Sequence, residues 1–368
     1  MTAICPRRSV PTIPYEGFYE RIANRVSRER IPLDASIELT FRCNLRCVHC
    51  YVNEPPGVRR VKHKELSTAE LHRITDEAVD LGCLYLLLTG GEPLLRSDFM
   101  DIYLHMKRKG VVPTLFTNGT ILTPRIADFL AEWPPFETEI TIYGSTQGIY
   151  EAVTGIPGSF GRCIEGLERL LDRKLRVRLK TIPMSINQHD MEGMRSLAAS
   201  YGLKFHWDPL INCRVDGGTG PAAVRLTGEQ IAALDLHEPI RVEHFRKAFR
   251  EGPRYGPPEE LITCGAYLNT FHIDPYGNLF PCMLVRWPAY SLREGSLRQG
   301  WEEAFPALRA RLRTKTVPCD GCAYNAACGT CVGWSQVETG DPEGLVPFLC
   351  EVTYARVRAF GDARPPLP

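Results

Sequence analysis

The sequence of 368 residues has no excess of charge of either sign and no long hydrophobic run. Its 44 Lys and Arg nearly balance its 43 Asp and Glu, for a net charge of +1. This balance argues against a dedicated nucleic-acid-binding protein, which usually has a strongly basic domain or stripe. The longest apolar stretch, around 81–88, is far shorter than the roughly 20 residues that span a bilayer. Pro11 and Pro14 interrupt the region where a signal peptide needs an apolar run. We therefore expect a cytoplasmic protein that binds neither nucleic acid nor a membrane.

Cysteine, by contrast, is abundant. The chain has 14 cysteines, unevenly placed. Disulfides explain them poorly in a protein without an export signal, because clustered cysteines in a cytosolic chain more often hold metal or carry out redox chemistry. The cysteines are therefore the first guide to function.

Short apolar runs alternate with helical patterns from residue 36 onward. We expect strands at 36–40, 84–88, 111–116, 139–143, 176–182 and 203–207, and helices at 68–81, 96–108, 124–130, 160–173 and 191–201. Strands that alternate with helices predict repeated βαβ units, and therefore an α/β fold with a parallel sheet and helices outside it. Periodicity alone leaves two alternatives, an open doubly wound sheet and an incomplete barrel.

Composition divides the chain into five regions. We expect a helical N-terminal segment at 1–33, a core at 34–210, a linker at 211–260, a cysteine-rich domain at 261–351 and a C-terminal tail at 352–368. A helix is expected at 228–236 within the linker, and seven cysteines lie among short strands and turns after it. The second domain is therefore expected to form around metal.

Three cysteines follow the first expected strand in the spacing C-x3-C-x2-C. Cys43, Cys47 and Cys50 share one loop, and no fourth cysteine is nearby in the sequence. Three thiolates can hold three irons of a cubane cluster and leave the fourth iron open to a ligand. The alternative is a zinc site completed by His49. The loop lies at the C-terminal end of a strand, where α/β barrels place their chemistry, and this favours the reactive cluster.

A second motif, Thr89-Gly90-Gly91-Glu92-Pro93, ends the next expected strand. Consecutive glycines let the backbone approach a ligand closely, and the Glu92 carboxylate and exposed carbonyls can accept hydrogen bonds from a cationic amine. Alone this motif is weak evidence, but it gains weight from the cysteine loop before it.

Together the two motifs resemble those of the radical S-adenosylmethionine (SAM) superfamily. The resemblance implies a partial (β/α)6 TIM-like barrel and a [4Fe–4S] cluster whose open iron binds SAM. One electron from a flavodoxin- or ferredoxin-type donor would then give methionine and a 5′-deoxyadenosyl radical, which abstracts hydrogen from a substrate. It also implies that SAM is contacted by His49, Gly90, Gly91, Glu92, Pro93, Thr117, Asn118 and Thr141.

One departure from the family concerns the SAM carboxylate. Many relatives have an Arg before the Gly that follows the fourth strand, whereas this chain has Thr154-Gly155. Lys180 on the fifth expected strand is the candidate that replaces it. Asp208, after the sixth expected strand, is a candidate general base or substrate anchor, with capping of a turn as the alternative.

The C-terminal cysteines resemble the SPASM extension of radical SAM enzymes, which holds two auxiliary iron–sulfur clusters. Two C-x2-C pairs would also fit a zinc ribbon, but seven ligands are too many for one tetrahedral zinc. The resemblance assigns Cys264, Cys282 and Cys331 to the first cluster, and Cys319, Cys322, Cys328 and Cys350 to the second. Some relatives have a further cysteine where this chain has Thr270, so the fourth ligand of the first cluster stays open.

SPASM proteins mostly modify peptides or proteins, so the expected substrate is a ribosomally made precursor peptide. Met283, where sulfatase-maturing relatives have an Asp, disfavours their reaction. The N-terminal segment is too short for a leader-binding domain, so a separate small leader-binding protein is expected. The alternatives are radical tailoring of a small molecule, such as a tetrapyrrole, and a zinc-binding scaffold without catalysis.

Overall fold

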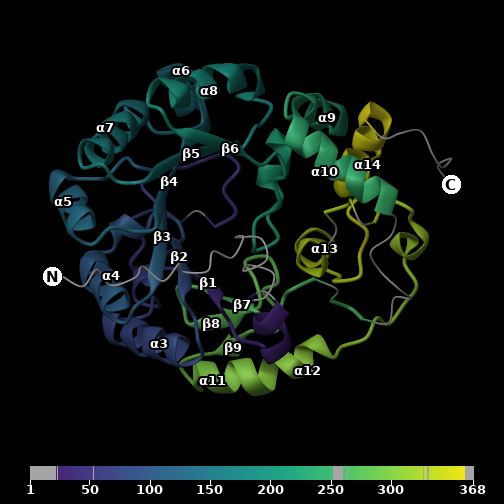
Figure 1. Ribbon diagram of the computed structural model, residues 1–368, viewed down its shortest axis with the longest axis horizontal. Helices are drawn as coiled ribbons and strands as arrows, with labels where there is room; N and C mark the ends of the chain where they lie inside the picture. Colours follow the sequence, from purple (N-terminus) through teal and green to yellow (C-terminus); the bar gives the residue numbers. More distant parts are fainter. Residues whose placement is uncertain are drawn as a thin grey trace, which may run out of the picture.

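The computed structural model describes residues 22, 24–52, 54–251, 260–262, 264–325, 327–329 and 331–360. Six parallel strands form most of its sheet: β1 (Asp34–Glu38), β2 (Tyr85–Thr89), β3 (Val112–Thr117), β4 (Glu137–Thr141), β5 (Val177–Thr181) and β6 (Lys204–Trp207). Their order in space follows their order in the chain, and they curve into an arc with helices outside (Figure 1). The predicted partial barrel is confirmed.

Helices cover the convex side of the arc. They are α3 (Thr68–Asp80), α4 (Phe99–Arg108), α5 (Pro124–Glu132), α6 (Gln147–Thr154), α7 (Ser159–Asp172) and α8 (Met191–Ser200). Local sequence explains their starts, since Ser67 forms a capping box with Glu70, and the Thr123 side chain accepts a hydrogen bond from the Ile126 amide. Helix α6 was not predicted, because its eight residues span barely two turns before Gly155 ends it with φ +66°.

Alternation along the strands separates a helix-facing side from a concave side. In β5, Val177 and Leu179 are buried in the core, whereas Arg178 and Lys180 point the other way. Paired residues on adjacent strands share a side, so the concave side also carries Glu139, which pairs with Arg178. The inside of the barrel is therefore unusually rich in charged side chains.

The sheet continues beyond β1 into the cysteine-rich region. Strand β7 (Thr270–Ile273) lies parallel to β1, and β8 (Asn278–Phe280) and β9 (Tyr290–Ser291) follow in antiparallel order. The full order is β6-β5-β4-β3-β2-β1-β7-β8-β9. The expected boundary near residue 261 therefore separates two regions that share one sheet.

The other helices close the far side of the ring in Figure 1. They are α9 (Gly228–Leu236), α10 (Pro239–Glu251), α11 (Leu297–Gln299), α12 (Phe305–Arg309), α13 (Val332–Thr339) and α14 (Pro347–Phe360), while the short α2 (Arg59–Lys62) lies near the cysteine loop. The helix expected at 228–236 is confirmed. No helix among the described residues is long and apolar enough to cross a membrane.

The region predicted as a C-terminal tail is helical as far as Phe360. Val352 and Ala355 of α14 are buried against α9, and Arg356 Nε lies 2.7 Å from Asp235 Oδ2, with both side chains at most 5% exposed. The predicted start of the tail was wrong because the prediction was based on the proline-rich sequence at the end of the chain. That sequence lies at 361–368, outside the described residues. Most of the expected N-terminal helix also lies outside them; within them, 22 and 24–29 are helical.

Candidate active site

The loop after β1 brings Cys43, Cys47 and Cys50 together. Backbone bonds hold it, since the Cys43 amide donates to the Glu54 carbonyl (2.8 Å) and the Arg46 amide to the Thr154 carbonyl (2.8 Å). Each thiol interacts electrostatically with at least one of the other two. The spacing read from the sequence therefore corresponds to a compact set of three sulfur ligands.

Burial and mutual repulsion make these thiols poor thiolates on their own. Burial, with the nearby Glu92 and Cys50 charges, raises the pKa of Cys43 to about 12, and burial raises the pKa of Cys47 well above its ordinary value. A bound cationic centre would offset both effects. Among the described residues, no three His, Cys, Asp or Glu side chains are arranged for a single metal ion. The thiol set fits a cluster in which each thiolate binds its own iron.

The two glycines of the second motif pack directly on this loop. A Cβ atom at Gly90 would lie 2.2 Å from the Thr40 carbonyl oxygen, and one at Gly91 would lie 2.3 Å from the Arg42 carbonyl oxygen. The Gly91 amide also donates to the Thr40 carbonyl at 2.7 Å. These glycines thus allow the end of β2 to touch the segment that leads into Cys43.

We expect Gly91→Ala to destabilise the fold by about 3 kcal/mol and to lower the iron bound per chain, because backbone atoms cannot move away as a flexible side chain can. Gly148→Ala is the matched control, since no described atom outside its own turn of α6 lies within 4 Å of its Cβ position. Urea unfolding and iron analysis measure both effects. A G91A protein with normal stability and iron would show that the close packing is dispensable.

The carboxylate of Glu92 is fully buried and already has partners. It accepts hydrogen bonds from the Asn118 amide (2.8 Å), the Thr117 hydroxyl (2.9 Å) and the Leu94 amide (3.1 Å). Burial outweighs these bonds and raises its pKa to about 7. Through these bonds Glu92 ties the end of β2 to the end of β3. Its role toward the amine of SAM stays a prediction.

His49 and Asn118 border the cysteine loop. The His49 ring is buried, its Nδ1 atom has no partner within the described structure, and its edge meets the Tyr143 ring at 4.9 Å between centroids. Burial lowers the pKa of His49 to about 4. Asn118 Nδ2 donates to Asn44 Oδ1 at 3.0 Å and lies 3.7 Å from Cys43 Sγ. The unpaired nitrogen of His49 fits a site that a ligand completes.

Lys180 lies inside the barrel and already has a partner. Its Nζ atom is 3.1 Å from Glu139 Oε2, and the ammonium group stands over the Phe116 ring. Burial lowers the pKa of Lys180 to about 8. Thr141 is its partner in the register of β4 and β5. The role of Lys180 toward a SAM carboxylate stays a prediction, since this lysine would have to share its charge with Glu139.

Asp208 caps its own turn. Its Oδ1 atom accepts a hydrogen bond from the Leu210 amide at 3.0 Å, and the residue is exposed. This geometry corresponds to the capping alternative, and a role of Asp208 as a general base or substrate anchor stays a prediction.

A polar network inside the barrel was not predicted. Fully buried Glu38 accepts a hydrogen bond from the Tyr51 hydroxyl (2.8 Å) and lies 2.9 Å from both His272 Nε2 and Arg286 Nη1. His272 Nδ1 lies 2.8 Å from Ser36 Oγ. Burial alone would raise the pKa of Glu38, but the charges of His272 and Arg286 lower it to about 2. A Glu within an apolar strand was the one sequence signal for this network.

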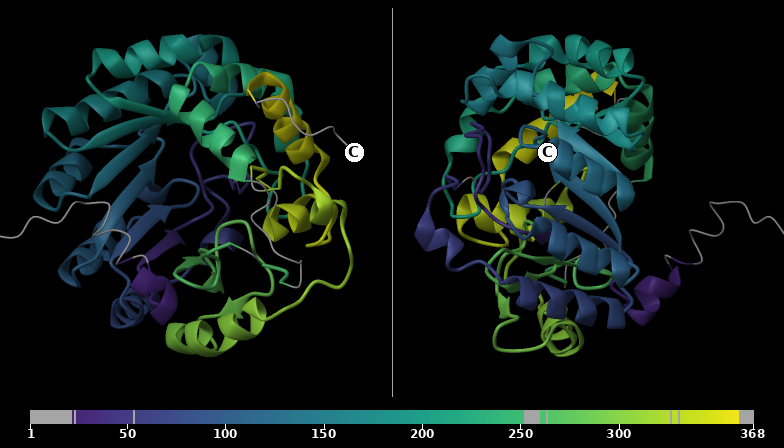
Figure 2. Two further views of the ribbon diagram at one scale, coloured as in Figure 1. Left: turned by 45° about the vertical axis from the view of Figure 1, so that its right-hand side comes forward. Right: turned by 90° about the vertical axis from the view of Figure 1, so that its left-hand side faces the viewer.

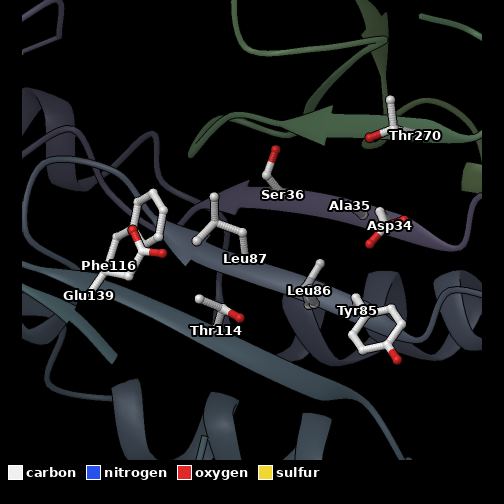
Figure 3. Close-up of a pocket in the computed structure, with 10 residues that line it drawn as sticks. All are labelled: Asp34, Ala35, Ser36, Tyr85, Leu86, Leu87, Thr114, Phe116, Glu139 and Thr270. Atoms are coloured by element: carbon white, nitrogen blue, oxygen red, sulfur yellow. The ribbon is translucent and has the colours of Figure 1, made fainter. Parts of the chain in front are cut away.

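A hollow of about 300 Å³ opens on the concave side of the sheet. Ser36 and Leu87, which pair across β1 and β2, line it together with Phe116 and Glu139, which pair across β3 and β4 (Figure 3). Asp34 and Thr270 at the first positions of β1 and β7 complete its lower wall. The hollow therefore lies in the barrel below the loop that carries Cys43.

The C-terminal thiols interact with one another in two sets, while their roles as cluster ligands stay a prediction. Burial raises the pKa of Cys331 to about 11, with contributions from Cys282 and Cys264, and burial raises that of Cys350 to about 11, with contributions from Cys328, Cys319 and Cys322. The buried phenol of Tyr267 also interacts with Cys282 and Cys264. An oxygen donor thus stands beside the first group, which lacks a fourth thiol.

Comparison with known proteins decides the family. Residues 37–198 match the model of the radical SAM superfamily. This part of the chain is therefore a radical SAM domain. The chain is 28% identical over 329 residues to the AdoMet-dependent heme synthase of Methanosarcina barkeri. The aligned residues make up 83% of this enzyme and 92% of that relative. The chain is also 27% identical over 327 residues to the mycofactocin maturase MftC of Mycobacterium ulcerans, covering 84% and 85% of the two chains.

The fold of this enzyme also has counterparts among solved structures. Streptococcus suis SuiB bound to its precursor peptide SuiA superposes with a TM-score of 0.68 at 16% identity, over 95% of this enzyme and 84% of SuiB. At this identity the likeness concerns the fold alone. It extends beyond the radical SAM domain to include the cysteine-rich region.

Proposed function

We propose that this enzyme cleaves SAM reductively and uses the resulting radical to modify a ribosomally made precursor peptide. The observation that carries the first part is the compact set of Cys43, Cys47 and Cys50 beside the buried Glu92. The peptide is supported by the similarity to mycofactocin maturase MftC and by the shared fold with SuiB, which was solved with a precursor peptide.

The three thiolates would hold a [4Fe–4S] cluster, which supplies, when bound and reduced, the electron that splits SAM into methionine and a 5′-deoxyadenosyl radical. The side chains of this enzyme would position the cluster and SAM. His49 and Tyr143 form a buried wall beside the thiols, and Glu92 fixes the ends of β2 and β3 around them. A closed, water-poor surrounding restricts the radical to the intended hydrogen atom.

The hollow below the loop has both apolar and charged walls. Leu87 and Phe116 exclude water from one part, while Glu139 and Ser36 offer hydrogen-bond acceptors to a substrate amide or ammonium group. A separate leader-binding protein would deliver the peptide by adding a strand to it, and an electron donor would reduce the enzyme.

The test is SAM cleavage by the reduced, reconstituted enzyme with candidate precursor peptides. We expect one of them to increase 5′-deoxyadenosine formation and to change in mass. A second candidate is radical tailoring of a tetrapyrrole, which the Methanosarcina barkeri relative favours. If a propionate-bearing tetrapyrrole changes in mass and none of the peptides does, the peptide proposal is wrong.

We propose that seven C-terminal thiols hold two auxiliary clusters, with Cys264, Cys282 and Cys331 on one and Cys319, Cys322, Cys328 and Cys350 on the other. Replacing Cys319, Cys322 and Cys328 by Ala is expected to remove about four irons per chain and to leave the SAM-binding cluster in place. Iron analysis and electron paramagnetic resonance measure this. The control is Cys83→Ala, which removes a buried thiol between α3 and β2; equal iron in both variants would refute the assignment.

A further inference from the structure

A run of basic side chains follows the cysteine loop. Arg59, Arg60, Lys62 and Lys64, which we call the basic strip, lie on and just after α2, and all four are exposed. Val61 between them is buried and anchors the segment. Within the described part of the chain, none of the four is paired with a carboxylate. In a protein with a net charge of +1, this is a strong local concentration of positive charge.

The basic strip is tied to the loop that carries the three thiols. The Cys43 amide donates to the Glu54 carbonyl, and the Glu54 amide donates to the Phe41 carbonyl at 3.0 Å, five residues before α2 begins. Arg60 interacts electrostatically with Tyr276, whose ring meets that of Phe41 edge to face at 5.3 Å. The strip therefore has a fixed place beside the segment that enters the cluster site.

The other end of the basic strip is also fixed. The Arg293 guanidinium donates to the Lys64 carbonyl at 3.0 Å and to the Glu65 carbonyl at 3.1 Å. The basic strip is therefore a cationic surface held at both ends, and its residues do not line the hollow of the barrel.

We propose that the basic strip is the docking surface for an acidic one-electron donor protein. Charge complementarity and nearness to the thiol loop favour this partner, because electron transfer needs a short path and a brief encounter, which opposite charges accelerate. A substrate must instead reach the inside of the barrel. The donor loses one electron and the cluster held by Cys43, Cys47 and Cys50 gains it, with no bond made or broken. This inference rests on the proposed function.

The test compares two charge-reversed variants of the reconstituted enzyme. R59E/R60E alters the basic strip, and R108E/R125E makes the same change of charge on exposed residues at the end of α4 and the start of α5. The probe is a reduced acidic ferredoxin in low salt. We expect R59E/R60E to weaken ferredoxin binding and to slow cluster reduction about tenfold or more, with R108E/R125E near the wild type. High salt should reduce the difference in cluster reduction rate between R59E/R60E and the wild type, because it screens the attraction between the two proteins.

Reduction by dithionite separates docking from the site itself. Because this small reductant needs no docking surface, R59E/R60E should give the wild-type rate of 5′-deoxyadenosine formation with it. If ferredoxin binds and reduces R59E/R60E as well as the wild type, the docking proposal is overturned while SAM cleavage stands. If R59E/R60E loses as much SAM cleavage with dithionite as with ferredoxin, the basic strip supports the cluster loop and is not a docking surface. If no variant and no wild-type protein cleaves SAM, the proposed function fails instead.

Discussion

Replacing Cys43, Cys47 and Cys50 together by Ala is expected to abolish 5′-deoxyadenosine formation by the reduced, reconstituted enzyme. Only these three thiols are proposed to leave an iron open for SAM, and they interact electrostatically with one another. Without the bound cluster the electron has no route into the sulfonium bond. The activity is measured by chromatography of 5′-deoxyadenosine under anaerobic conditions.

The control for this variant is Cys83→Ala combined with Cys163→Ala, which removes two thiols buried in the core. This change costs stability of about 1 kcal/mol per site but leaves the loop intact, so cleavage should persist. Cleavage that survives in the triple Ala variant would refute the cluster assignment. A wild-type protein that is colourless and contains zinc in place of iron would support the scaffold alternative.

Glu38→Gln is expected to lower the free energy of unfolding by about 3–5 kcal/mol at neutral pH, because it leaves buried charge on Arg286 without its partner. The amide is nearly isosteric, so the loss reports charge and hydrogen bonding more than volume. Chemical unfolding of the anaerobic protein measures the change. Glu294→Gln, an exposed carboxylate on the loop after β9, should stay within about 0.5 kcal/mol of the wild type.

The Glu38 effect also has a defined pH dependence. Its pKa is about 2 in the folded protein against an ordinary value of 4.5, so the folded state favours the ionised form. The contribution to stability is therefore fully present above about pH 4.5 and is lost as the pH falls from there toward 2. The difference between the wild type and E38Q should shrink in that window. A difference that stays constant down to pH 3 would contradict the ionic account.

Local spacing was enough to predict the strands of the barrel and the nearness of Cys43, Cys47 and Cys50 to one another. Each depends on short-range rules, the period of two along a strand and ligand spacings such as that of Cys43 and Cys47. The Glu38 network could not be predicted in the same way, because His272 and Arg286 lie 234 and 248 residues further along the chain. Only the folding of β7 beside β1 brings them to Glu38.

The structure also shows partners that the sequence did not predict for residues whose positions were predicted. Glu92 lies where its motif places it, but its carboxylate serves neighbouring amides. Lys180 lies on the predicted strand, but Glu139 already holds it. Sequence gives the identity and order of such groups, whereas their partners depend on which side chains face each other across the sheet.

The pairing of β7 with β1 joins the first strand of the barrel to the cysteine-rich region within one sheet. Strand β1 leads into Cys43, and its Ser36 pairs with His272 of β7 in the cysteine-rich region. Bending between these two strands would break a ladder of backbone hydrogen bonds, so the cysteine-rich region is held rigidly beside the strand that leads into Cys43. Any bending of the barrel would then occur at the β6 end of the sheet, where the described residues form no further strand (Figure 2).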